Sequence, residues 1–165
     1  MNRLLLVLCL LIIPVSAFPF QNEPDGFRGV PWDSSMDRIA GIRPLGKPAG
    51  SMQGYMKMDE NFLQDGITLS DITYRADSGR FVEAVNQFDC AQYGALRESL
   101  TKNFGAASAR AHNVKSMIWR GTVTTIILAP APAATGKSPA PNGEPLLCTL
   151  TYSSTASLKK SAPRQ

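Results

Sequence analysis

Two cysteines, Cys90 and Cys148, are the residues of this chain best suited to chemistry, and a third, Cys9, lies in an apolar run near the start. In an oxidising compartment, an even pair of cysteines commonly forms a disulfide. Such a bond would close a loop of about 58 residues and stabilise the fold by about 2–4 kcal/mol. Two other states remain open. They are a buried Cys148 thiol that packs as a small apolar side chain, and a reactive Cys90 thiolate stabilised by a helix N-terminus.

The other residue types that carry out catalysis are too few or unsuitably spaced. His112 is the only histidine, which excludes a multi-histidine metal site and leaves a Ser-His-Asp arrangement dependent on one residue in a polar stretch. The Gly-Lys-Ser at 136–138 lacks the first glycine of a P-loop. Asp59, Glu60 and Asp71 could pair across a sheet for acid–base work, but the sequence does not supply their separation. We therefore expect no enzyme, and no catalytic, cofactor-binding or metal-binding residues.

One stretch, Cys90 to Gly105, has the pattern of an amphipathic helix. Asp89 can cap its start and Gln92 can complete a capping box, while Gly105 supplies a stop. Its apolar residues recur at helical spacing, so the helix has one face to bury. These residues are Tyr93, Leu96, Leu100 and Phe104.

A shorter helix is predicted over Ser34 to Ala40, where Asp33 or Ser34 can cap the start and Gly41 can end it. Trp32 lies just before the cap. The simplest interpretation of Trp32 is a core or staple residue, and the alternative is an exposed recognition tryptophan.

Six segments have the β-branched or alternating pattern of strands. Turn residues at 64–66 and 77–79 predict antiparallel hairpins. The predicted fold class is α+β, an antiparallel sheet of about six strands covered on one face by two helices, in the order helix, three strands, helix, three strands. The predicted strands are Tyr55–Phe62, Ile67–Arg75, Arg80–Phe88, Val114–Arg120, Thr122–Ala129 and Leu146–Ser153. The predicted core is Leu96, Leu100, Phe104, Trp119, Ile127 and Leu150.

The first seventeen residues have the three-part pattern of a secretory signal peptide, with a basic start, an apolar run from Leu4 to Ile13 and a small-residue end at Ala17. We expect cleavage near Ala17 and a mature protein in the periplasm or outside the cell. The later chain is predicted to have no stretch long enough to cross a membrane, and so no stable membrane anchor. The predicted division is an extended lead-in at 18–29, one domain at 30–154 with an exposed Pro/Ala-rich insertion at 130–145, and a disordered basic tail at 155–165.

The formal charge of +4 comes from the two ends of the chain. Between Phe18 and Leu158, 13 basic residues face 13 acidic ones, so the body is neutral. No basic stripe with interleaved aromatic residues is present, and we therefore expect no nucleic-acid partner.

Two element patterns resemble known families. Residues 33–48, with a short capped helix and a Leu45-Gly46-x-Pro48 ending, resemble the opening of the BamE-type outer-membrane assembly lipoproteins, although the lipidated cysteine of that type is missing. The repeated helix-and-strands order is similar to that of secreted β-lactamase inhibitor proteins, and residues 27–32 resemble the start of small exported bacterial proteins of unknown function. The first two resemblances imply a non-enzymatic extracytoplasmic protein that binds another protein. The alternative is a small-molecule or lipid carrier with an apolar cavity between sheet and helices.

Overall fold

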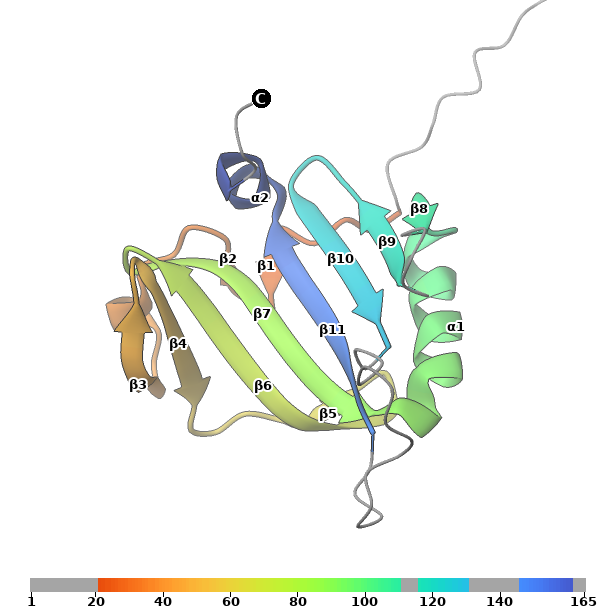
Figure 1. The fold of residues 1–165 in the computed structure, drawn as a ribbon, viewed down its shortest axis with the longest axis horizontal. Coiled ribbons are helices and arrows are strands. Elements are labelled where there is room, and N and C mark those ends of the chain that lie inside the picture. Colours follow the sequence, from red (N-terminus) through yellow and green to blue (C-terminus); the bar gives the residue numbers. More distant parts are fainter. Residues whose placement is uncertain (1–20, 111–115, 131–145, 162–165) are drawn as a thin grey trace, which may run out of the picture.

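The computed structural model describes residues 21–110, 116–130 and 146–161, and its main feature is one large antiparallel sheet (Figure 1). The strand order is β3-β4-β6-β7-β11-β10-β9-β8, with β5 paired to β6 outside this path, and β1 and β2 form a separate hairpin. The strands are β1 (Gly26–Phe27), β2 (Val30–Pro31), β3 (Ile42–Ala49), β4 (Met52–Lys57), β5 (Leu63–Gln64), β6 (Ile67–Asp77), β7 (Arg80–Asp89), β8 (Ala109–Arg110), β9 (Met117–Arg120), β10 (Thr124–Ala129) and β11 (Leu147–Ser154). The helical elements are η1 (Met36–Arg38), η2 (Cys90–Gln92), α1 (Tyr93–Phe104) and α2 (Thr155–Ser161).

The predicted α+β fold, with two helices over about six strands, is wrong. The predicted helix at Ser34–Ala40 is only the single 3-10 turn η1, so among the described residues α1 alone supplies a full helix against the sheet. The reason is that the sheet uses the backbone of this stretch. Ser35 is extended and forms a bridge with Arg80, and the Met36 N–H donates to the Gly79 carbonyl at 3.0 Å.

The edge strand β3 lies in a stretch rich in proline and glycine, residue types that are uncommon inside strands. The Met58 N–H donates to the Gly41 carbonyl, so residues 41 and 43 turn their hydrogen-bonding groups toward β4. The nitrogen of Pro44 therefore points away from β4. Because no hydrogen bond to β4 is made at that position, the missing N–H of proline does not weaken the pairing of the two strands. A proline at this outward position also obstructs the addition of a further strand.

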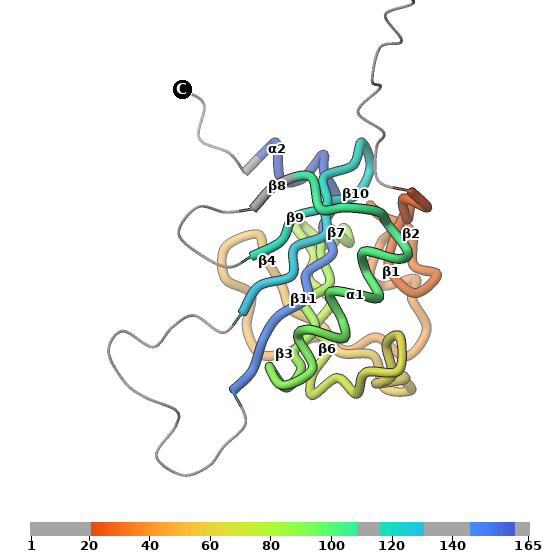
Figure 2. Tube along the Cα trace, turned by 90° about the vertical axis from the view of Figure 1, so that its right-hand side faces the viewer, coloured from red at the N-terminus to blue at the C-terminus, as the bar shows by residue number. Residues whose placement is uncertain are grey.

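One face of the sheet holds the core, and α1 and the β1–β2 hairpin lie on that side (Figure 2). Phe27 of the hairpin packs against two tyrosines of the sheet, Tyr74 and Tyr152, with ring centroids 5.7 and 5.1 Å apart. From α1, Leu96 and Leu100 are fully buried. Because inward residues alternate along each strand, the opposite face carries a separate set of side chains.

The predicted core is correct for four residues and wrong for one. Leu96, Leu100, Trp119 and Leu150 are fully buried, and Phe104 packs against them partly buried. Ile127 points to the other face, because the neighbouring residues Ile126 and Leu128 take the inward positions of β10.

The start of the main helix is tighter than predicted. The Asp89 carboxylate accepts from the Ala91 N–H at 2.9 Å, as a cap should, but the first turn is the 3-10 helix η2. The capping box with Gln92 does not form, and the buried Gln92 Oε1 has no partner among the described residues. Gly105 ends α1 with φ of 83°, a conformation that favours glycine.

The segment after β11 also differs from its prediction as a disordered tail. It continues as α2, and the buried Thr155 hydroxyl lies 3.0 Å from that of Thr125. The predicted signal peptide at 1–17 and most of the predicted insertion at 130–145 lie outside the described residues.

Truncation of Leu100 to Ala should lower the free energy of unfolding by about 2–5 kcal/mol, because it leaves a cavity under α1. The matched change Leu158→Ala removes the same atoms from an exposed side chain on α2 and should cost less than about 0.5 kcal/mol. Urea unfolding of both variants measures the difference. Equal small losses would show that α1 is not packed against the sheet.

Candidate functional site

Cys90 and Cys148, for which a disulfide was one of three predicted states, are bonded in the structure. Cys90 opens η2, Cys148 lies buried in β11, and a disulfide links them with their Cα atoms 5.0 Å apart. The Cys90 N–H also donates to the Leu146 carbonyl at 2.8 Å. The bond therefore ties the start of the helix to the last strand and leaves neither thiol free for nucleophilic chemistry.

Trp32, for which a core or staple role was the simplest interpretation and recognition the alternative, packs partly buried against the core. Its ring stacks on Phe81 with centroids 4.8 Å apart, and its indole N–H donates to the Thr124 hydroxyl at 2.6 Å. Because both the apolar ring and the polar N–H already have partners, the contacts of Trp32 fit a packing role.

The three carboxylates considered for acid–base work do not form a pair. Glu60 binds an arginine, and Asp71 accepts from the Thr73 hydroxyl at 2.8 Å. Among the described residues, no group of three or more His, Cys, Asp or Glu is placed to hold a metal ion. His112 and the Gly-Lys-Ser at 136–138 lie outside that part of the chain.

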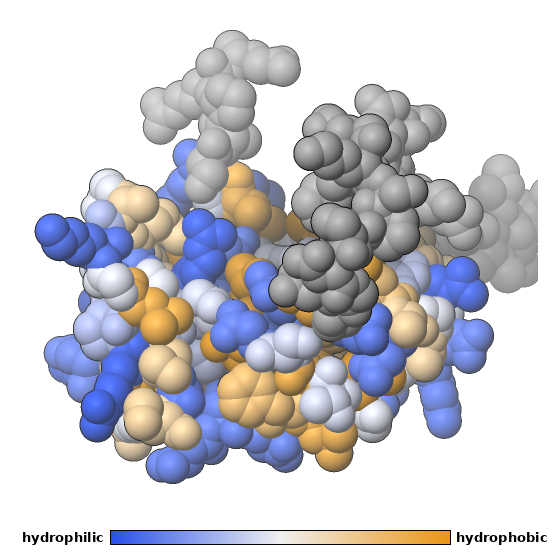
Figure 3. Space-filling model, turned by 60° about the horizontal axis from the view of Figure 1, so that its bottom comes forward, coloured by the Kyte–Doolittle hydropathy of each residue, from blue (hydrophilic) through white to orange (hydrophobic). Residues whose placement is uncertain are grey.

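The most unusual surface of the molecule lies between β4 and β6. Met58, Phe62 and Leu63 expose 51%, 44% and 54% of their surface there, and we name residues 58–66 the display segment. Figure 1 places β5, which belongs to this segment, at the lower edge of the sheet, and Figure 3 looks at that lower side. It shows an apolar area bordered by hydrophilic side chains. Exposed apolar areas with a polar border are typical of interaction sites.

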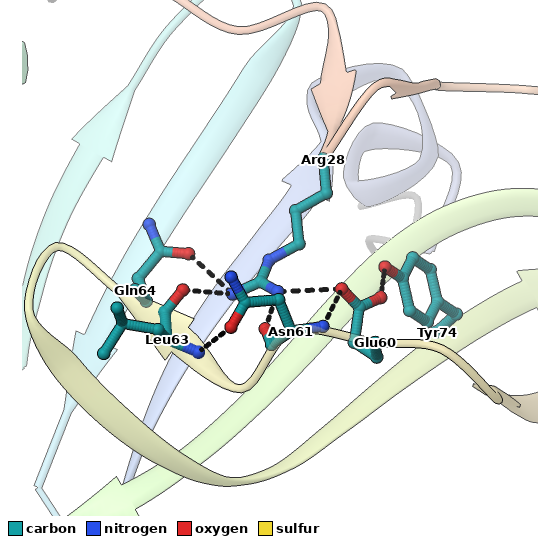
Figure 4. Close-up of polar contacts among 6 residues, drawn as sticks. All are labelled: Arg28, Glu60, Asn61, Leu63, Gln64 and Tyr74. Atoms are coloured by element: carbon teal, nitrogen blue, oxygen red, sulfur yellow. Dashed lines mark hydrogen bonds and ion pairs between the residues drawn. The ribbon is translucent and has the colours of Figure 1, made fainter.

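The display segment is held by the tip of the β1–β2 hairpin. Phe27 pairs with Val30, so the turn between them has two residues, Arg28 and Gly29, with φ of 49° and 76°. Two positive φ angles define a type I′ turn, whose twist matches that of an antiparallel hairpin. The turn brings the Arg28 side chain to the display segment (Figure 4).

Arg28 binds four groups of the display segment. Its Nη1 donates to Glu60 Oε1 at 2.8 Å and to the Asn61 carbonyl, and its Nη2 donates to the Leu63 carbonyl at 3.0 Å and to Gln64 Oε1 at 3.4 Å. The Leu63 N–H in turn donates to Asn61 Oδ1 at 3.0 Å. One guanidinium therefore fixes the backbone on both sides of Phe62, whose own carbonyl accepts from β6.

Glu60 links Arg28 to strand β6. Its side chain is 6% exposed, and its second oxygen accepts from the Tyr74 hydroxyl of β6 (Figure 4). Burial alone would raise the pKa of Glu60, but the hydrogen bonds from Tyr74 and Arg28 outweigh it and lower that pKa. Burial, together with the Glu60 carboxylate, raises the pKa of Tyr74, which keeps the hydroxyl a donor. The Arg28–Glu60 pair is thus charged, and both carboxylate oxygens of Glu60 accept hydrogen bonds.

Two open hollows flank the β1–β2 hairpin. One, of about 460 Å³, lies beside the display segment and is lined by Arg28, Lys57, Glu60 and Asp65 among others. The other, of about 430 Å³, has Arg38 and Arg80 among its lining residues. Both are open to solvent and carry charged side chains, unlike the enclosed apolar cavity that a lipid carrier needs.

This surface was not among the predicted sites, although two short sequence patterns indicate parts of it. Arg28-Gly29 between extended residues is typical of a tight turn, and Phe62-Leu63 places two large apolar residues directly before the turn at 64–66. The contact between them joins residues 32 to 36 positions apart, which local patterns cannot supply.

Comparisons of the chain with protein-family models, curated proteins and solved structures find no match. The resemblances to BamE-type and β-lactamase inhibitor proteins therefore stay predictions. Within the described residues, no helix is long and apolar enough to cross a membrane.

Replacement of Glu60 by Gln should lower the free energy of unfolding by about 1–3 kcal/mol at pH 7, because the partly buried Arg28 loses its counter-charge. The folded-state pKa of Glu60 lies below its ordinary value, so its stabilisation is present at neutral pH and is lost as the pH falls through that pKa. The difference in unfolding free energy between wild type and Glu60→Gln should therefore shrink in urea titrations as the pH falls through the lowered pKa of Glu60. Glu83→Gln, in the more exposed Arg75–Glu83 pair, is the matched control and should cost less than about 1 kcal/mol. A pH-independent gap would contradict the charged state of Glu60.

Alkylation under denaturing conditions should label the mature chain only after reduction, because Cys90 and Cys148 are bonded. Intact-mass measurement before and after reduction provides the test. Reduction should also lower the free energy of unfolding by about 2–4 kcal/mol, since the bond closes a loop with a sequence separation of 58 residues. Two thiols labelled without reductant would reject the bond.

Proposed function

We propose that this chain is an exported, non-enzymatic binding protein that engages another protein through the display segment. The observation that carries the proposal is the combination of exposed Met58, Phe62 and Leu63 with a backbone fixed by the partly buried Arg28–Glu60 pair. Apolar side chains on a mobile loop would lose conformational freedom on binding. Here folding has already ordered the backbone of the display segment, so less conformational entropy is lost on binding. Preorganisation of this kind raises affinity.

The three side chains also suit the centre of a protein interface. Phe and Met are enriched in such centres, and large apolar anchors at fixed positions are typical of residues that dominate binding energy. Hydrophilic side chains border the apolar area in Figure 3, as they do in the polar rim of an interface.

The blocked edge of the sheet favours the same mode of binding. A partner that added a strand to β3 would meet Pro44, which has no N–H to donate and lies on the outward side. We therefore infer that the partner contacts side chains of the display segment and does not extend the sheet.

The double change Phe62→Ser and Leu63→Ser should abolish partner recovery in affinity capture from the native envelope, with the mature protein as bait. The control is Leu45→Ser, which alters another exposed apolar side chain, 39% exposed, on β3. Each variant must first show the wild-type unfolding curve. A partner that both variants retain would move the binding site away from the display segment. A partner lost with both would point to a general loss of apolar surface.

A further inference from the structure

The charges around the display segment determine the kind of partner that it fits. Two basic residues, Arg28 and Lys57, and three acidic ones, Asp59, Glu60 and Asp65, belong to it or contact it, which leaves a net charge of −1. Both basic residues are only partly exposed. Arg28 is bound to Glu60 and only 17% exposed, and Lys57 is half-buried and acts electrostatically on the same carboxylate.

The two remaining carboxylates are exposed, and Asp65 accepts one hydrogen bond, from Gln64 Nε2 at 3.4 Å. Asp59 follows Met58, and Asp65 lies in the turn two residues after Leu63. Within the described part of the chain, neither has an ion-pair partner. Phe62 and Leu63 therefore lie in the sequence between two exposed carboxylates, and Glu60 already pairs with Arg28, which leaves Lys57 as the one nearby cation without an ion-pair partner among the described residues.

We propose that the display segment binds an amphipathic segment of another protein that carries apolar side chains on one face and basic side chains beside them. This inference rests on the proposed function and specifies its partner. Apolar contact with Phe62 and Leu63 supplies affinity, while the carboxylates of Asp59 and Asp65 attract and orient the basic residues. Complementary charges at the rim of an interface act mainly on association rate and on the choice of partner.

A second copy of the chain is the competing occupant. The exposed part of α2 combines Leu158 with Lys159 and Lys160, so it has the same chemistry. However, α2 spans only seven residues, and Figure 1 shows it at the opposite end of the sheet from β5. Such a contact between copies would be head-to-tail and would build an open chain unless its rotation closed a ring.

Three labelled peptides of equal length provide the test by fluorescence anisotropy with the full mature protein. One is an amphipathic helix of Leu and Lys, the second has Glu in place of Lys, and the third is a scrambled Leu/Lys peptide without an apolar face. We expect the Leu/Lys helix to bind about tenfold more tightly than either of the others at low salt, with the preference over the Glu peptide shrinking in 0.5 M NaCl.

Two variants separate the contributions. Asp59→Asn with Asp65→Asn should weaken binding of the Leu/Lys helix about three- to tenfold, and Phe62→Ser with Leu63→Ser should remove it. The charge control is Asp77→Asn with Glu98→Gln, which makes the same change in net charge outside the display segment and should leave the affinity unchanged.

Four results would overturn the inference. They are equal binding of the Leu/Lys and Leu/Glu peptides, equal binding of the scrambled peptide, an equal effect of the charge control, and self-association by sedimentation velocity that Phe62→Ser with Leu63→Ser abolishes. Failure of all three peptides while envelope capture still requires Phe62 and Leu63 would reject the basic partner and leave the proposed function standing. Loss of that requirement would reject both.

Discussion

The central constraint on this molecule is that its one full helix among the described residues is too short to cover one face of a wide sheet alone. A helix of twelve residues is about 18 Å long, while eight strands span about 34 Å. The N-terminal hairpin and the display segment cover part of the remainder. Phe27 lies over Tyr74 and Tyr152, and Arg28 brings the chain between β4 and β6 against the same face. The proposed binding surface therefore also belongs to the layer that covers the core face of the sheet.

A partly buried charged pair holds this surface in place. Burying Arg28 and Glu60 costs solvation energy, and an apolar pair of equal volume could give equal or greater stability. What the ion pair adds is direction, because the planar guanidinium binds two backbone carbonyls and two side chains in fixed positions. Tyr74 then holds the carboxylate from the opposite side. The arrangement specifies the path of the display segment more than it adds to the free energy of folding.

The sequence predicted the parts of this fold that local chemistry determines. The Asp77-Ser78-Gly79 turn indicated the β6–β7 hairpin, helical spacing indicated α1, and alternation indicated the inward residues of β11, including Cys148. It failed where a distant partner decides. Proline is typical of a loop, and Pro44 fits β3 only because its nitrogen points outward at the edge of the sheet. The Ser34–Ala40 stretch does not form a helix because its backbone is hydrogen-bonded to the sheet. The candidate site was missed for the same reason, since Arg28 and Glu60 carry no pattern that links them.

The path of the N-terminal segment has a consequence for the order in which its contacts form. Before it reaches Arg28, this segment binds structure made much later in the chain. The Gln21 N–H donates to the Phe104 carbonyl, and Glu23 accepts from Val123, 100 residues further on. In a chain that emerges in order, these two contacts therefore form only after residues 104 and 123 have been made. The segment that leads to Arg28 is thus tied to both halves of the domain, so the two halves must be joined before every contact of that segment is in place.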